Sequence, residues 1–386
     1  MQKNILILIA YFGLCTSSFS QTSCRINGGN LKINGNYNLV LNNTQFVNDG
    51  SFDAGTGRVS ITGNSTDVQS AIAGTSSTTF YNLQINKSSN GSQLQRAIQV
   101  DNELQMTSGN LDLNGNNCTL GSANGIIISE SETSHITGLS GGFIRKTVTL
   151  NAPTNVNPGN MGMVCSSNAT IGALTIRRGH IPQTISGNPG IARFFEIDSP
   201  NNLDLDLSLQ FNYLDAELNG NTEASLGLWR QDSSFWFNPP TASSDATNNS
   251  IRVNNINLLT KLTLAPAAPK LDLKVFLEGP YSTSNGLMND DLRVGDMIPT
   301  KEPYTTLGYQ HGSIGGGESV NPFVFNTSSN DAIVDWIIAE LRASSNNNVV
   351  AARSALLQKD GDIVDLDGRS PLSFPGIGIG SSYYIT

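Results

Sequence analysis

An eight-residue motif that occurs twice limits the folds open to this chain. Gly-Asn-Leu-Lys-Ile-Asn-Gly-Asn begins at Gly29, and Gly-Asn-Leu-Asp-Leu-Asn-Gly-Asn begins at Gly109, with apolar residues in the same places. Between and after the copies, short apolar runs alternate with Asn, Gly and Ser, which are turn residues. Stacked repeats of short strands produce this pattern, because each strand adds one rung and buries every second side chain. We therefore predict a β-solenoid over residues 21–150, and favour a right-handed parallel β-helix over an antiparallel sandwich.

The middle region, residues 151–268, predicts longer strands with one buried face. Between Leu203 and Tyr213, apolar residues alternate strictly with Asp, Ser, Gln and Asn. A period of two places one face of a strand in a core and the other in water. We predict a β-sandwich that ends at the proline-rich linker Ala265–Pro269.

Residues 269–386 predict a second sandwich module. The segment Asp331–Leu341 fits a helix capped by Asp331 or a strand, and its β-branched residues favour the strand. The predicted fold class is therefore all-β, with an N-terminal β-solenoid (parallel β-helix-like) followed by two β-sandwich (Ig-like) modules.

The N-terminus has the layout of a secretory signal peptide over residues 1–20. Lys3 precedes the apolar run Ile5–Leu14, and small residues follow near Ser20. No later run is apolar for long enough to span a bilayer as a helix, so we expect a secreted protein, extracellular or held at the outer cell surface. The net charge of -9 argues against nucleic acid and anionic membranes as partners.

The cysteines give little sign of chemistry. Cys15 leaves with the signal peptide, so that Cys24, Cys118 and Cys165 remain and at most one disulfide forms within the chain. We favour two buried thiols and a mobile Cys24 over a ligand set.

Other motifs point to turns and loops rather than to catalysis. Gly138–Gly142 has the spelling of a serine-hydrolase elbow, but a strand-like segment follows it where a helix is required. The three histidines lack metal-ligand spacing. The basic segment Arg177–Pro182 could contact an anion or a sulfated glycan, but is more typical of a solvated loop at a strand end. A polysaccharide lyase would gather acids and a base on one solenoid face, whereas the acids of the first region are scattered.

Four aspartates near the C-terminal end form the candidate calcium site: Asp360, Asp362, Asp365 and Asp367. Calcium loops space carboxylates at alternate positions around a glycine, which this segment imitates in part. A β-hairpin with a type I′ Asp360-Gly361 turn is the interpretation that we favour. Calcium is thus the one cofactor that the sequence suggests.

Several segments resemble a known group of proteins. Asp335–Arg342, Ala355–Gly368 and Lys274–Tyr281 are similar to the C-terminal module of large secreted and surface proteins of Bacteroidota-type bacteria. Asn157–Asn160 and Phe211–Asn219 resemble their middle regions. The resemblance implies export by the type IX route and a role in adhesion, surface structure or display. Because those proteins usually continue beyond the Tyr-Tyr strand into a sorting domain, it also suggests a truncated C-terminal module.

The expected function is therefore that of an extracellular, non-enzymatic structural or adhesion protein, with glycans or cell-surface components as partners. The alternative is a carbohydrate-binding or polysaccharide-degrading β-helix protein, which would need a groove lined by carboxylates and aromatic side chains.

Overall fold

The computed structural model describes residues 22–66, 69–232, 235–312, 314–377 and 382–386, so the predicted signal peptide lies outside the described residues. The protein is almost entirely β. It forms two compact units, one of residues up to 183 with 191–220 and 243–263, and one of residues 184–190, 221–242 and 264–386. None of the helices in the described segments combines the length and the apolar character needed to cross a membrane.

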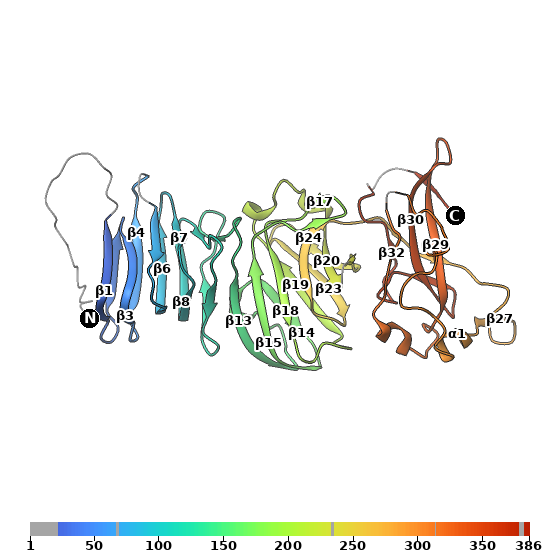
Figure 1. Ribbon diagram of the computed structural model, residues 1–386, viewed down its shortest axis with the longest axis horizontal. Coiled ribbons are helices and arrows are strands. Elements are labelled where there is room, and N and C mark those ends of the chain that lie inside the picture. The colour runs from blue at the N-terminus through green and yellow to red at the C-terminus, as the bar shows by residue number, and fades with distance from the viewer. Residues whose placement is uncertain (1–21, 67–68, 233–234, 313, 378–381) are drawn as a thin grey trace. The chain divides into compact units, whose positions relative to one another are not determined.

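The N-terminal part of the first unit is a parallel β-solenoid of about six turns, which confirms the predicted class (Figure 1). Each rung contributes one strand to each of two sheets. The first sheet contains β1 (Ser23–Lys32), β3 (Gln45–Asp53), β5 (Ser70–Ala73), β7 (Ser92–Leu94), β9 (Leu111–Asp112) and β12 (Ile136–Thr137). The second contains β2 (Asn38–Asn42), β4 (Arg58–Gly63), β6 (Thr78–Lys87), β8 (Ile98–Ser108), β10 (Cys118–Leu120) and β13 (Ile144–Asn151), with β11 (Ile126–Ile128) paired to β8.

The repeated motif marks the same corner of two rungs. Each copy runs through a strand of the first sheet and turns at Gly35 or Gly115, both with positive φ, before β2 or β10 begins. Asparagine serves other turns of the solenoid, since Asn43, Asn90 and Asn114 also have positive φ. Inside the rungs, apolar side chains such as Phe46 and Phe80 stack from one turn to the next, with ring centroids 5.5 Å apart.

The solenoid continues into a sandwich through one shared sheet. After β13 the pairing becomes antiparallel, along β15 (Thr170–Gly179), β18 (Phe194–Asp198) and β24 (Lys261–Pro266). A second sheet holds β14 (Met163–Ser166), β19 (Leu207–Asn212), β23 (Ser250–Ile256) and β22 (Thr241–Asp245). Phe195 and Phe211 meet between the sheets, with ring centroids 5.1 Å apart. The 3₁₀ turns η1 (Pro158–Asn160) and η2 (Asp215–Glu217) complete this part.

The alternating segment from Leu203 to Tyr213 is a shorter strand than predicted. Asp204 and Asp206 have positive φ, which breaks the extended backbone, so β19 begins only at Leu207. Leu203 is 49% exposed, whereas the apolar residues from Leu205 onward are buried. The pattern therefore identified the buried face correctly and the strand length wrongly.

The second unit is built around a five-stranded sheet in the order β26 (Leu273–Lys274), β31 (Asp362–Val364), β30 (Val349–Gln358), β29 (Ile333–Ala343) and β33 (Tyr383–Ile385). Strand β29 confirms the prediction that the segment Asp331–Leu341 forms a strand rather than a helix. Both sheet faces are buried, one beneath Met288, Leu372 and Phe374 and the other beneath Ile298 and Val320. The remaining elements are β16 (Thr184–Ile185), β17 (Asn188–Pro189), η3 (Glu223–Ser225), β20 (Leu226–Asp232), β21 (Phe235–Phe237), β25 (Lys270–Leu271), β27 (Tyr281–Ser282), β28 (Leu287–Met288), α1 (Asp291–Val294), η4 (Pro322–Asn326) and β32 (Leu372–Ser373).

Because the rungs pack closely, we expect one added methyl group between them to reduce the stability of the protein strongly. Gly109 has a φ of 72°, and a Cβ there would lie 1.8 Å from the carbonyl oxygen of Lys87 in the preceding rung. We expect Gly109→Ala to lower the free energy of unfolding by more than about 3 kcal/mol, measured by urea denaturation. The matched control is Gly35→Ala, where φ is 66° but no atom lies within 4 Å. It should cost only the backbone penalty of about 1–2 kcal/mol. Equal losses would contradict close rung contact as the cause.

Candidate functional site

The four predicted calcium ligands lie on the β30–β31 hairpin and the loop after it, and each carboxylate has a partner within the protein. Asp360 and Asp362 pair with Lys274, at 3.7 and 2.8 Å from its Nζ. Asp367 accepts hydrogen bonds from the backbone N–H and the hydroxyl of Ser370. Asp365 is buried and pairs with Arg353. The described contacts thus distribute these four side chains among three different groups of partners.

The hairpin itself confirms the favoured interpretation, although its turn type differs. The N–H of Gly361 donates to the carbonyl oxygen of Gln358 at 2.9 Å, and Leu357 pairs with Ile363. Gly361 has a φ of 94°, whereas Asp360 is not among the residues with positive φ. A type I′ turn requires positive φ at both positions, so the loop is a type I turn followed by a glycine bulge.

Arg353 and Asp365 form a bidentate ion pair in the core of the second unit. Nη1 and Nη2 of Arg353 each lie 3.0 Å from a different carboxylate oxygen, and Nη1 also donates to the carbonyl oxygen of Ser373 at 2.6 Å. The carboxylate accepts from the N–H and hydroxyl of Ser373 as well. Asp365 therefore links β30 to β32 through Arg353 and Ser373, which is a structural role.

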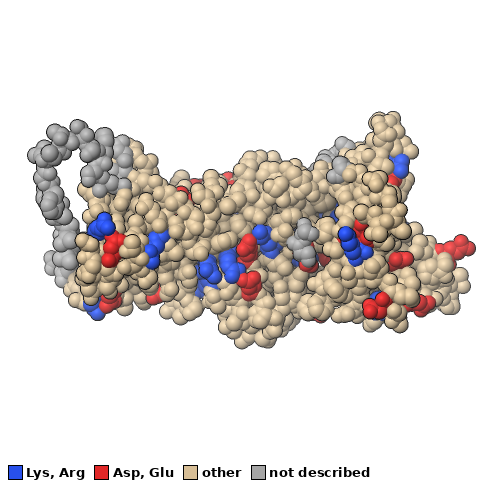
Figure 2. Space-filling view, in the orientation of Figure 1, with Lys and Arg blue, Asp and Glu red and all other residues tan. Residues whose placement is uncertain are grey.

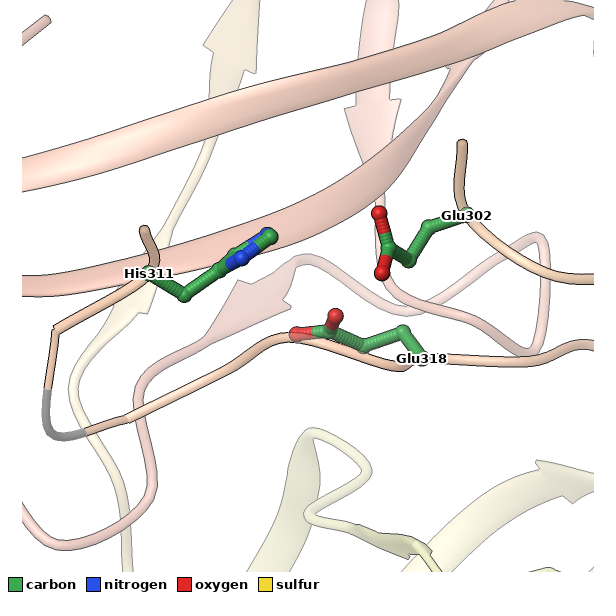
Figure 3. Close-up of side chains that lie close together, drawn as sticks. All are labelled: Glu302, His311 and Glu318. Atoms are coloured by element: carbon green, nitrogen blue, oxygen red, sulfur yellow. The ribbon is translucent and has the colours of Figure 1, made fainter. Parts of the chain in front are cut away.

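A second group of acidic side chains in this unit does converge. One carboxylate oxygen of Glu302, one of Glu318 and one ring nitrogen of His311 all lie within 4.8 Å of one another, the only such group of three or more His, Cys, Asp or Glu in the described residues. Figure 3 shows the three side chains pointing toward one another from loop segments beside the sheet. The two glutamates are 1% exposed and His311 is 6% exposed.

Backbone and hydroxyl groups hold these three side chains in place. The N–H groups of Gly317 and Thr305 donate to the two oxygens of Glu302, at 2.8 and 3.0 Å. The N–H of Gly316 donates to Glu318 at 2.8 Å, and Oγ of Ser354 lies 2.9 Å from Nε2 of His311. Burial opposes ionisation of Glu302, but its hydrogen bonds to Thr305 and Gly317 outweigh this and lower its pKa. Glu302 is therefore held in its charged form.

Gly316 and Gly317, in the run Gly315–Gly317, each give one of the two acids a backbone donor. All three have positive φ, and a Cβ on Gly315 would lie 1.9 Å from the carbonyl oxygen of Ala352. A run of three glycines by itself predicts a flexible connection, whereas the structure has a turn packed against β30. Glu302, His311 and Glu318 do not form a short sequence motif. The glycine run was therefore the one sequence feature that could have pointed to this group.

The first unit contains a buried network of ion pairs, which includes residues of the basic segment that we predicted to be solvated. Arg178 is fully buried, and its Nη1 and Nη2 each lie 2.8 Å from an oxygen of Glu130. Glu217 lies 2.8 Å from Nε of Arg193 and 3.6 Å from Nδ1 of His180. The predicted solvated loop at Arg177–Pro182 is therefore wrong for Arg178 and His180. Arg178 lies on β15 and His180 follows directly after it, and both side chains are buried.

The network has shifted pKa values with clear causes. Burial raises the pKa of Glu130, but the charge and hydrogen bonds of Arg178 outweigh it, so that the pKa falls to about 2. Burial opposes ionisation of Glu217 in the same way, and the charge of Arg193 lowers its pKa overall. For His180, burial and the charges of Arg178 and Arg193 lower the pKa, which favours a neutral imidazole.

The cysteines behave as the sequence suggested in two of three cases. Cys24, Cys118 and Cys165 are free thiols, and the latter two are buried. Burial raises the pKa of Cys118 to about 12 and that of Cys165 to about 11, so neither is a ready nucleophile. Cys24 lies within β1 and is half-buried.

The described residues thus define an all-β protein in which a parallel β-solenoid runs into sandwich-like sheets, with a buried Glu-His-Glu group in the C-terminal unit. Comparison of the chain with protein-family models, with curated proteins and with solved structures gave no match.

Removing Asp365 should destabilise the second unit strongly. In Asp365→Ala the guanidinium of Arg353 would be left buried without its counter-charge, which typically costs about 3–5 kcal/mol. Asp362→Ala is the control, because its pair with Lys274 is 39% and 52% exposed and should contribute less than about 1 kcal/mol. Urea denaturation of both variants measures the difference, and similar losses would contradict the structural role of Asp365.

Calcium binding at the four aspartates has its own test. If they hold calcium, a chelator lowers the melting temperature of the wild-type protein, and millimolar calcium restores it. An unchanged melting temperature in both conditions removes this prediction.

The buried network predicts a loss of stability in acid. The pKa values of His180, Glu130 and Glu217 are all lowered on folding, so below their ordinary values the unfolded chain binds more protons than the folded chain. The contribution of His180 should fall as the pH drops below about 6.5, and that of the carboxylates between pH about 4.5 and about 2. Urea denaturation across this range measures it.

The variant Glu130→Gln isolates the contribution of the Glu130 carboxylate to the pH dependence of stability. The variant should be less stable than wild type at pH 7, because Arg178 loses its counter-charge, and its stability should change less below pH about 4.5. Glu196→Gln, which removes a part-exposed pair with Lys261, should keep the wild-type profile. Parallel profiles for wild type and Glu130→Gln would contradict the assignment.

Proposed function

We propose that this protein is an extracellular, non-enzymatic structural or adhesion protein, displayed on or released from the cell surface. The observation that carries the proposal is the outer surface of the solenoid, where polar side chains bond to one another from rung to rung. Export by the type IX route, which the resemblance to Bacteroidota-type surface proteins implies, is part of the same proposal.

The outward side chains of the second solenoid sheet form such a row. Oγ of Ser60 lies 3.0 Å from Oδ1 of Asn38 and 2.8 Å from Oε1 of Gln84, and Nε2 of Gln84 donates to Oε1 of Gln105 at 3.2 Å. Because these groups satisfy one another, the surface is ordered without a ligand. A row of this kind supports a role as a stiff, neutral spacer better than a role as an active site.

Charge on the surface is sparse, which also supports this role. Only 14% of the residues are charged, and the charged side chains in Figure 2 lie scattered among wide uncharged areas. Some of those on the solenoid are paired, as Arg25 is with Asp49 at 2.7 Å and Arg58 with Glu103 at 3.3 Å. Such a surface suits contact with neutral glycans or with other surface proteins rather than with polyanions.

The carbohydrate-active alternative receives less support from the side chains that it needs. The candidate stacking platform consists of Trp229, Phe235, Trp236 and Phe237. Trp229 and Phe237 are 1% and 3% exposed, and Phe235 and Trp236 are partly buried. The depression lined by Thr175, Glu196, Asp198 and Lys261 has no aromatic side chain, and Lys261 already pairs with Glu196 at 3.0 Å. Sugar binding in such sites usually relies on an exposed ring.

A binding experiment tests the proposal. The purified chain, labelled with a fluorophore, should bind whole bacterial cells or glycan-coated surfaces saturably, and it should release no product from a panel of polysaccharides. An unrelated secreted protein of similar net charge serves as the control for non-specific adsorption. Product release from any polysaccharide would overturn the non-enzymatic assignment, and adsorption equal to that of the control would overturn adhesion.

A further inference from the structure

We infer that Glu302, His311 and Glu318 bind one divalent transition-metal ion, which fastens the long loop segment between α1 and β29 to the central sheet of the C-terminal unit. The inference does not depend on the proposed adhesive function. It follows from the separation of the three groups, from their charge and from the contacts that orient them.

The separation of the three groups suits a shared ion better than direct contact. Their ligand atoms lie within 4.8 Å of one another, yet among the described contacts no hydrogen bond or ion pair joins His311 to either glutamate. Nitrogen and oxygen ligands lie about 2.0–2.2 Å from zinc, so that two ligands of one ion are about 3–4 Å apart. The three ligand atoms therefore lie near the spacing of groups that share one ion.

The charge of the group also calls for a cation. Glu302 and Glu318 are both 1% exposed, and two carboxylates buried side by side repel each other and lose hydration. The nearest cationic group is Arg353, whose Nε lies 3.9 Å from Glu318. Its two terminal nitrogens are already occupied by Asp365. A divalent ion would balance the two glutamates.

The supporting contacts are those of a site built to hold its ligands still. Each glutamate accepts a hydrogen bond from a backbone N–H of the glycine turn, and Ser354 on β30 fixes the ring of His311. Such outer contacts orient the ligands in metal sites. They come from both the loop and β30, so that an ion bound here would join the two.

The ligand types select the class of ion. Calcium prefers six to eight oxygen ligands, whereas a set of one imidazole and two carboxylates suits zinc or manganese. We therefore expect Zn²⁺ or Mn²⁺ to bind much more tightly than Ca²⁺.

Metal titration of the full chain tests the inference. After treatment with a chelator and dialysis, Zn²⁺ or Mn²⁺ should raise the melting temperature by several degrees, and elemental analysis should find one ion per chain. Ca²⁺ at the same concentration should have little effect. If neither Zn²⁺ nor Mn²⁺ binds or changes the melting temperature, or if Ca²⁺ acts equally well, the inference is wrong.

Variants separate this site from adventitious binding at cysteine or surface histidine. Glu318→Gln and His311→Gln keep the side-chain size, and both should remove the metal-dependent shift while circular dichroism stays that of the wild type. Without metal, Glu318→Gln should melt no lower than wild type, because it removes a repelling buried charge. Glu340→Gln is the matched control, since that glutamate pairs with Arg342 in the same unit, and it should keep the shift. A shift that survives in Glu318→Gln and His311→Gln would overturn the assignment.

Discussion

Parallel stacking of one rung on the next is the constraint on which the first unit depends, because it leaves a strand edge exposed wherever the stack stops. The chain resolves this at the last rung. Strand β13 pairs in parallel with β10 on one side and antiparallel with β15 on the other, so the solenoid sheet becomes the sandwich sheet without a break. The apolar core and the backbone hydrogen bonds therefore continue past the last rung, and no separate cap is needed there.

Arg178 secures this transition. It lies on β15, the first antiparallel strand, and pairs with Glu130 from the last rung of the solenoid, while Nη1 also donates to the carbonyl oxygen of Met161 at 3.0 Å. At the opposite end, β1 pairs only with β3 among the described strands. That edge carries Arg25 and Lys32, both ion-paired, and an irregular register between Asn27 and Asn30. Charges and bulges of this kind discourage the addition of a further strand.

The sequence predicted those features that depend on neighbours along the chain. Apolar runs and asparagine corners mark each rung locally, and the Asp360-Gly361 pair marks the hairpin, so the solenoid and the C-terminal strands were predictable. Strand length at Leu203 was not, because Asp204 and Asp206 adopt the left-handed conformation that their side chains tolerate. The burial of Arg178 was hidden for another reason. Its partner Glu130 lies 48 residues away, and only the fold brings them together.

The buried ion pairs of the two units differ in how their charges are balanced. This difference supports a bound cation at the Glu-His-Glu group. In the first unit Arg178 and Arg193 face Glu130 and Glu217 around a neutral His180, so the charges cancel. In the second unit Arg353 pairs with Asp365 and lies 3.9 Å from Glu318, while the ion pairs of the described residues do not reach Glu302. Buried carboxylates persist when a cation compensates them or when they take up protons. The backbone N–H groups of Gly317 and Thr305 donate to the two oxygens of Glu302 and fix the orientation of its carboxylate. A bound cation is then the compensation that agrees with the contacts, and the glycine turn that supplies the donors is part of the site rather than a connector.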